Sequence, residues 1–216
     1  MTPHALELLK SIRNRKGIIF SPLTTRSTEQ YERISFFEDG PPSVALAANG
    51  GILYLDGVRD EEWFEESKRM INGCQEEFKK GTDYLAGDKN VYFEIRTVDE
   101  LFVFTKSSEP LETRAGLDSI LDQNMVCTWN IGDKVYIFPK KLTKGKAVER
   151  LRKRFSPDLV ICAGDSDFDI SMLDSADLAL CPQDLKQYLN TRKAVSFDTG
   201  QWNYAEQLLE YINIRY

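Results

Sequence analysis

Histidine is nearly absent from the sequence, and cysteine occurs only in isolation. His4 is the single histidine, and the four cysteines lie far apart with no CxxC pair among them. This pattern argues against a zinc site made of cysteine and histidine. Reduced, mostly buried thiols are the simpler expectation, and they predict a cytoplasmic protein.

Long apolar runs and an excess of positive charge are also absent. No segment approaches the roughly 18 apolar residues of a membrane-spanning helix, and residues 1–20 lack the apolar centre and cleavage site of a signal peptide. The 28 lysines and arginines are outnumbered by 34 aspartates and glutamates, which gives a net charge of −6. Because nucleic acids and anionic membranes need clustered positive charge, we expect neither as a partner. The oligomeric state stays open.

The first and last parts of the chain share one pattern. With 216 residues, 42% of them hydrophobic, the chain can bury a core of its own. Short apolar runs alternate with helical stretches, which is typical of strands buried in a parallel sheet. We expect strands at 17–23, 43–48, 52–55, 159–163, 178–181 and 194–197, and helices at 3–16, 28–37, 144–154, 168–175, 182–189 and 203–213.

The middle of the chain has a different pattern. Helical stretches at 60–80 and 111–123 alternate with two β-hairpins, one of which turns at Gly132-Asp133. This order predicts a four-stranded antiparallel sheet with two helices on one face.

Together the two patterns predict an α/β fold with an insertion. A Rossmann-like parallel-sheet core would comprise residues 1–56 and 140–216, and an α+β cap would occupy residues 57–139. Active sites of open parallel sheets lie at the carboxyl ends of the strands. An insertion that leaves from one of those ends is therefore placed to cover the site as a lid.

The densest group of chemically active side chains follows the expected strand at 159–163. Asp165, Asp167 and Asp169 lie within five residues, between that strand and a helix. Carboxylates this close repel one another, and Mg²⁺, which prefers oxygen ligands, would relieve the repulsion. The alternative is an acidic loop in which Asp167 or Asp169 caps the helix. A calcium EF-hand loop is excluded, because the sixth and twelfth positions are not the required Gly and Glu.

Two further segments are candidates for binding phosphate. Thr24-Thr25-Arg26 ends the first apolar run, where hydroxyls and free backbone N–H groups can form an anion site. The alternative is that Thr24 or Ser27 only caps the next helix. Residues 140–154 are strongly basic, and we expect most of them on a solvated helix face. Lys144 is the exception, because it stands where the chain re-enters the core and could place its charge near phosphate.

In order and spacing, these segments resemble the motifs of the haloacid dehalogenase superfamily of phosphatases, and more narrowly its sucrose-phosphatase-like and Cof-type branch. Residues 160–173 (VICAGDSDFDISML) resemble the family's strand, GDSxxD motif and short helix, with Phe168 where many relatives have Asn. Residues 142–145 (LTKG) resemble the lysine motif, and 18–27 (IIFSPLTTRS) resemble the strand ending in TGR. Residues 48–51 (ANGG) resemble the NG segment before the lid.

The resemblance implies site residues, a cofactor and a substrate class. Thr24, Thr25 and Lys144 would bind phosphate. Asp165 and Asp169 would hold Mg²⁺, and with Lys144 they would form the catalytic set. The substrate would be a small phosphorylated metabolite such as a sugar phosphate, since a lid of this size favours small molecules.

One family motif does not occur in these 216 residues. Family members begin with a strand ending in DxDxT, whose first Asp is the nucleophile, and no DxDxT is present here. We therefore assign no nucleophile. In the family that strand lies in the middle of the sheet, so we expect a core lacking its first strand. Our interpretation is that the natural protein starts upstream; closure of the sheet, or a strand from another chain, are the alternatives.

Two functions are consistent with this sequence. The first is a Mg²⁺-dependent phosphatase of a small phosphorylated metabolite, which we expect to be inactive or impaired in this chain without the nucleophile. The second is a catalytically dead protein that keeps the phosphate and metal pocket for binding or regulation. A purely structural scaffold fits less well, because Thr24, Lys144, Asp165 and Asp169 are all present.

Overall fold

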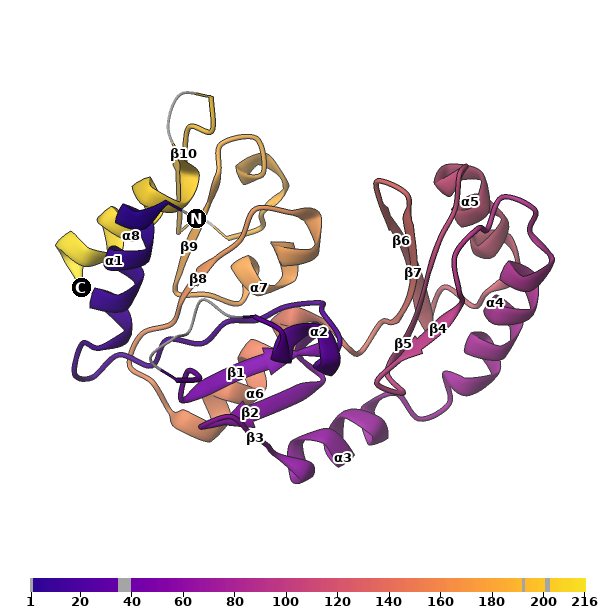
Figure 1. Ribbon diagram of the computed structural model, residues 1–216, viewed down its shortest axis with the longest axis horizontal. Helices are drawn as coiled ribbons and strands as arrows, with labels where there is room; N and C mark the ends of the chain where they lie inside the picture. Colours follow the sequence, from indigo (N-terminus) through magenta and orange to yellow (C-terminus); the bar gives the residue numbers. More distant parts are fainter. Residues whose placement is uncertain (1, 35–39, 192, 201–202) are drawn as a thin grey trace.

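The structure is an α/β fold in which the strands of the described residues form three sheets (Figure 1). It is a computed structural model, and it describes residues 2–34, 40–191, 193–200 and 203–216. One sheet is parallel and two are antiparallel. The predicted fold class is confirmed. Within the described ranges, no helix is long and apolar enough to cross a membrane.

The parallel sheet is the centre of a three-layer core. Its order is β10 (Ala194–Phe197), β9 (Leu178–Pro182) and β8 (Ile161–Ala163). Helices α1 (Pro3–Arg13) and α8 (Tyr204–Arg215) pack on one face, and α6 (Lys144–Phe155) and α7 (Ile170–Asp174) on the other. The side chain of Leu180 packs toward α1 and α8, whereas its neighbours Ala179 and Cys181 pack toward α7. This alternation is what a strand buried on both faces requires.

The prediction of a strand at 17–23 is wrong, because only Leu23 makes a β-bridge. Leu23 pairs with Leu46 in parallel, and Leu46 N–H donates to the carbonyl of Pro22. Pro22 has no N–H to donate to a ladder, which explains why the strand does not extend through it. Through this bridge, Leu23 is connected to a small antiparallel sheet, which is formed by β1 (Val44–Ala47), β2 (Ile52–Leu55) and β3 (Val58–Arg59). The single core sheet that we expected is therefore two sheets.

Three helix predictions also need correction. The stretch 60–80 forms two helices, α3 (Glu61–Met70) and α4 (Gln75–Gly87), because Gly73 adopts a φ of +98° that ends the first helix. The stretch 182–189 forms only a 3₁₀ turn, η3 (Lys186–Tyr188). Helix α2 (Thr28–Glu32) is shorter than expected, and residues 35–37 of that prediction lie outside the described residues.

The four-stranded antiparallel sheet of the middle segment is confirmed. Its order is β4 (Arg96–Val98), β5 (Phe102–Lys106), β7 (Lys134–Pro139) and β6 (Val126–Ile131). Helices α4 and α5 (Pro110–Ile120) cover one face, where Val103, Ile137 and Leu117 are fully buried. The other face is turned toward the core (Figure 1).

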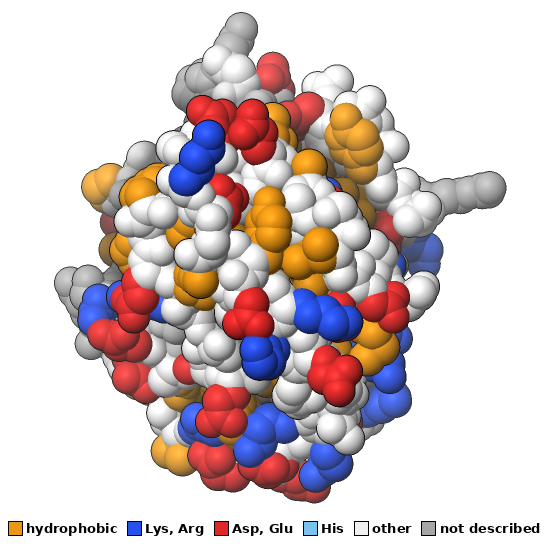
Figure 2. All heavy atoms as spheres, turned by 90° about the vertical axis from the view of Figure 1, so that its right-hand side faces the viewer, with side chains coloured by type: hydrophobic (Ala, Val, Ile, Leu, Met, Phe, Trp, Pro, Cys, Tyr) orange, Lys and Arg blue, Asp and Glu red, His pale blue; other side chains and the backbone are white. Residues whose placement is uncertain are grey.

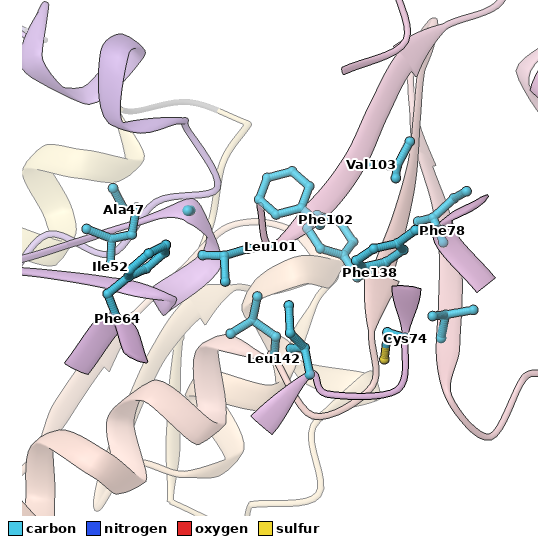
Figure 3. Packing of buried hydrophobic residues seen from close by; sticks show 14 of the residues in the cluster. Ala47, Ile52, Phe64, Cys74, Phe78, Leu101, Phe102, Val103, Phe138 and Leu142 are labelled. Atoms are coloured by element: carbon cyan, nitrogen blue, oxygen red, sulfur yellow. The ribbon is translucent and has the colours of Figure 1, made fainter. Parts of the chain in front are cut away.

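One continuous hydrophobic cluster joins the core to this sheet (Figure 3). It begins at Ala47 and Ile52, passes Leu101 and Leu142, and ends under the cap helices at Phe78. Leu101, in the turn between β4 and β5, and Leu142, between β7 and α6, are 0% and 2% exposed, and both lie beside Gly51 of the core. Burying a Leu side chain contributes roughly 1.5–3 kcal/mol, so this contact holds the two parts together.

The outer face of the cap is polar and mixed in charge. Figure 2 shows acidic and basic side chains interspersed over it, with scattered hydrophobic ones between them. On α4, Lys79 pairs with Asp83 at 2.5 Å, and Lys80 pairs with Glu77 at the same distance. The Lys79–Asp83 pair is exposed, and an exposed pair of this spacing adds only about 0.3–0.5 kcal/mol to a helix, whereas Glu77 is buried.

Candidate functional site

The acidic loop after β8 is organised around one buried carboxylate. The loop continues into a 3₁₀ turn, η2 (Asp167–Asp169), and then into α7. One oxygen of Asp169, Oδ2, accepts hydrogen bonds from the backbone N–H groups of Asp165 and Ser166, both at 3.1 Å, and from Ser166 Oγ at 3.0 Å. Asp169 is buried, whereas Asp165 and Asp167 are exposed. Asp169 therefore holds the turn through groups that precede it and makes no capping hydrogen bond to α7, so the capping alternative is wrong for Asp169, and Asp165 faces solvent.

Gly164 allows this turn to close. A Cβ atom on Gly164 would lie 2.3 Å from Cβ of Asp169, which is far inside van der Waals contact. Any other residue would push Asp169 away from the loop. The glycine of the GDSxxD motif is thus required sterically, because no side chain fits at position 164.

Lys144 reaches this carboxylate from the first turn of α6. Thr143 caps the helix, because its side chain accepts from Lys146 N–H. The ammonium Nζ of Lys144 lies 2.5 Å from Asp169 Oδ1, and both side chains are more than 90% buried. A buried charge of either sign is costly when it is alone, so each residue depends on the other. The structure therefore brings together two of the three residues in the predicted catalytic set.

Gly145 lets α6 approach α7 closely enough for this pair. Its N–H donates to Ser171 Oγ at 3.1 Å. A Cβ atom at this position would lie 2.3 Å from the carbonyl oxygen of Ser171. The glycine next to Lys144 therefore fixes the distance between the two helices.

Asn49 connects the end of the first apolar run to the lysine segment. It lies in the 3₁₀ turn η1 (Ala48–Gly50) with a φ of +59°. Its backbone N–H donates to the carbonyl of Thr24 at 2.9 Å, and its side-chain Nδ2 donates to the carbonyl of Leu142 at 2.9 Å. The side-chain oxygen Oδ1 is buried and has no hydrogen-bond partner within the described part of the chain. Asn49 thus ties the Thr24 segment to the lysine segment. The sequence pointed to residues 48–51 as a motif but not to this role of Asn49.

Thr24 and Thr25 line a cleft between core and cap. The cleft has a volume of about 550 Å³ and is bounded by residues 24–27, 29 and 30 on the core side and mainly by β4, β5 and β7 on the cap side. Its lining does not include Lys144, Asp165 or Asp169. Thr24 Oγ1 accepts from Arg26 N–H at 3.2 Å, and Ser27, not Thr24, caps α2. The hydroxyls of Thr24 and Thr25 therefore lie at a cleft of the size that small ligands occupy.

Phe168 links the acidic loop to the cap. Its ring packs against Trp129, Tyr136 and Phe138 at centroid distances of 5.2, 5.7 and 5.5 Å. Tyr136 also lines the cleft. Phe168, which the sequence marked only as a departure from the family pattern, therefore connects the acidic loop to strands β6 and β7.

Tyr204 supports the loop from behind, and no sequence pattern pointed to it. Its hydroxyl donates to the carbonyls of Gly164 and Leu180 at 3.1 and 3.2 Å. Burial, reinforced by the nearby carboxylates of Asp165 and Asp169, raises the pKa of Tyr204 well above its usual value of 10.0. The hydroxyl therefore stays protonated and continues to donate throughout the neutral range.

The donor set at the loop fits a magnesium ion only in combination with other ligands. Over the described ranges, no group of three or more His, Cys, Asp or Glu side chains comes together to hold a metal. Asp165 offers an exposed carboxylate, and Asp169 lies beside it with its oxygens bonded to Lys144 and the loop. Mg²⁺ commonly takes one or two carboxylates and completes its shell with water and phosphate oxygens. The residues present are compatible with that arrangement.

Comparison with known proteins identifies the family. Residues 43–188 match the family model for haloacid dehalogenase-like hydrolases. The chain belongs to this family. The match includes Lys144, Asp165 and Asp169 and all of the cap sheet. A curated relative, phosphoglycolate phosphatase of Methanoculleus marisnigri, is 31% identical over 179 residues, which cover 71% of this chain and 75% of the relative.

Solved structures of the family share the fold. The sucrose-phosphatase of Synechocystis, solved with sucrose and phosphate, superposes with a TM-score of 0.75 at 16% identity, covering 99% of this chain and 92% of that one. A haloacid dehalogenase-like hydrolase from B. subtilis gives a TM-score of 0.64 at 15% identity, covering 100% and 93% of the two chains. At such low identities, the likeness extends to the fold alone.

Proposed function

We propose that this site binds the phosphate of a small phosphate monoester together with Mg²⁺, as part of a phosphatase. The observation that carries the proposal is the buried Lys144–Asp169 pair, 2.5 Å long, at the carboxyl end of β8. A buried lysine that is held by a carboxylate at this edge of a parallel sheet is placed to meet an anionic ligand. We place the lid at residues 57–139, over this edge.

Each residue has a distinct role in the proposal. The hydroxyls of Thr24 and Thr25 bind phosphate oxygens from the cleft, and the ammonium of Lys144 neutralises phosphate charge. Asp169 orients Lys144 and the loop through the hydrogen bonds of its two oxygens. Asp165 and Asp169 would hold Mg²⁺. When bound, that ion would supply Lewis-acid stabilisation of the charge on the phosphoryl oxygens.

The substrate in this proposal is a small phosphorylated metabolite. The cleft of about 550 Å³ limits the size of the ester. The names of two similar proteins, a sucrose-phosphatase and a phosphoglycolate phosphatase, point to a sugar phosphate or a phosphorylated hydroxy acid.

A binding or regulatory protein without turnover is the second candidate. The observation that favours it is the sequence of the 216 residues, which contains no DxDxT and therefore no assigned nucleophile. A site that holds phosphate and Mg²⁺ without a nucleophilic carboxylate would bind esters and release no phosphate.

Two measurements on the 216-residue chain separate these candidates. Calorimetric titration with sugar phosphates and phosphorylated hydroxy acids in MgCl₂ measures binding, and phosphate release from the same esters measures turnover. Mg²⁺-dependent release that is lost in Lys144→Ala supports the phosphatase. Binding without release, also lost in Lys144→Ala, supports the binding protein. Absence of binding to every ester overturns both.

A further inference from the structure

The cap wall of the cleft is one face of the four-stranded sheet. In the register of β5 and β7, Phe104 lies opposite Tyr136, and Lys106 lies opposite Lys134. These four residues alternate with Val103, Thr105, Val135 and Ile137, which are buried on the helix-covered face. Since side chains alternate between faces along a strand, all four belong to the face that is turned toward the core, and all four line the cleft.

This wall combines half-exposed aromatic rings with several cations. Phe93, Phe104 and Tyr136 are each partly exposed in the cleft. Arg96 lies opposite Phe104 on β4, and its guanidinium stands 5.1 Å from the ring of Phe93. Arg96 is paired with Glu94 at 2.7 Å, so Lys106 and Lys134 are the two cations of this wall that remain to be considered beside the aromatic surface.

The two lysines form an unusual cross-strand pair. Like charges directly opposite on antiparallel strands destabilise the sheet, so such a pair needs a counterion. Asp133 supplies one to Lys106, at 3.1 Å, and also accepts from the hydroxyl of Tyr92. Within the described residues, Lys134 has no ion pair. One positive charge of the pair is thus left for a ligand.

The carboxylates that line the cleft cancel part of this charge. Asp99 accepts from the neutral Thr28 N–H at 3.0 Å and so still offsets one cation, whereas Glu29 is paired with Arg33 at the end of α2. Arg26 adds a further cation from the core side. Three of the charged pairs at the cleft are internal, namely Arg96–Glu94, Lys106–Asp133 and Arg33–Glu29. Among the described residues, the remaining charges of the lining are Arg26, Lys134 and Asp99, which leave an excess of one positive charge, and a positive cleft concentrates anions.

We propose that Lys134, with Lys106, binds a carboxylate on the alcohol part of the phosphate ester. This inference rests on the proposed function and makes it narrower. The phosphate lies toward Thr24 and Lys144, the carbon skeleton packs on Phe104 and Tyr136, and the second anion meets the lysines of the cap. The preferred substrate is then a small phosphorylated hydroxy acid and not a neutral sugar phosphate.

A matched pair of esters tests this proposal. 3-Phosphoglycerate and glycerol 3-phosphate share a three-carbon skeleton and differ in a carboxylate against a hydroxymethyl group. Calorimetry on the full 216-residue chain in MgCl₂ gives both dissociation constants. We expect the wild-type chain to prefer 3-phosphoglycerate by about tenfold, which is typical for one charge-assisted contact.

Variants assign the preference to the lysine. Lys134→Gln should lower the affinity for 3-phosphoglycerate about tenfold more than the affinity for glycerol 3-phosphate, and Lys134→Arg should restore most of the difference. Lys79→Gln, on the outer face of α4, is the charge-matched control. Equal losses for the two esters would show that Lys134 attracts only the phosphate, and equal wild-type affinities would show no carboxylate site; either result overturns this inference alone. If neither ester binds, the proposed function fails as well.

Discussion

The pairing of Lys144 with Asp169 dominates the site at the scale of single residues. Lys144→Met removes the positive charge and keeps most of the chain length, so Asp169 is left as a buried carboxylate with no counterion. We expect a loss of about 3 kcal/mol in the free energy of unfolding, measured by urea denaturation at pH 7. Lys146→Met is the control, because its pair with Glu149 is 53% and 50% exposed and should be worth less than about 0.5 kcal/mol. Similar losses in both variants would contradict the buried pair.

The residues of the candidate site could be predicted from the sequence, but the contacts between them could not. Lys144 and Asp169 were each assigned to phosphate or metal, yet their mutual contact depends on how α6 packs on α7, across 25 positions of sequence. The capping alternative for Ser27 was correct because capping is a local interaction. Tyr204 could not be found at all, since its role depends on a fold that brings it next to Gly164, 40 residues away.

The packing of α6 against α7 is an element-scale requirement that one glycine satisfies. In Gly145→Ala, the new Cβ would meet the backbone oxygen of Ser171 at 2.3 Å, so α6 must shift and carry Lys144 away from Asp169. We expect destabilisation of about 2 kcal/mol and weaker phosphate binding, measured by urea denaturation and calorimetry. Gly87→Ala, at the end of α4 where nothing lies within 4 Å, should be neutral or slightly stabilising. A tolerated Gly145→Ala would count against this packing.

The aromatic contact between the acidic loop and strands β6 and β7 is a second element-scale feature. Phe168→Ala removes one ring from three aromatic pairs, with Trp129, Tyr136 and Phe138. Because such pairs contribute about 0.5–1.5 kcal/mol each, we expect faster hydrogen exchange in β6 and β7 and a change in tryptophan fluorescence. Phe168→Leu, which keeps much of the apolar volume, should show a smaller effect. Unchanged exchange in Phe168→Ala would mean that the four-stranded sheet is held on the core without help from this aromatic contact.

Element predictions succeeded where local patterns were complete. The cap hairpins have strict alternation and a Gly-Asp turn, and their four-stranded sheet formed as expected. The apolar run at 17–23 also looked like a strand, but Pro22 removes a ladder donor and pairing stops at Leu23. The stretch at 60–80 kept helical periodicity across Gly73, and only its positive φ of +98° reveals the break.

Buried groups of the whole molecule predict its response to alkaline pH. Burial raises the pKa of the Cys162 thiol from 9.0 to about 12, so the folded state keeps the neutral form. The corresponding stability is complete below pH 9 and is lost as pH rises from 9 toward 12, by up to about 1.4 kcal/mol per pH unit, because the unfolded thiol ionises first. Urea denaturation between pH 8 and 11 measures this slope. Cys162→Ala should reduce this slope by the amount that corresponds to about one proton. An unchanged slope would rule out Cys162 as its source.

At the scale of the whole molecule, we propose that the loop after β8, the lysine of α6 and the threonines of the cleft together form a Mg²⁺-dependent phosphate site. Its most direct test is calorimetric titration of the 216-residue chain with inorganic phosphate, in MgCl₂ and in EDTA, for the wild type, Lys144→Gln and Asp165→Asn. We expect saturable binding in MgCl₂ that weakens at least about tenfold in EDTA and in both variants. Phosphate binding that is unaffected by EDTA and by both substitutions, or no binding at all, would contradict the account.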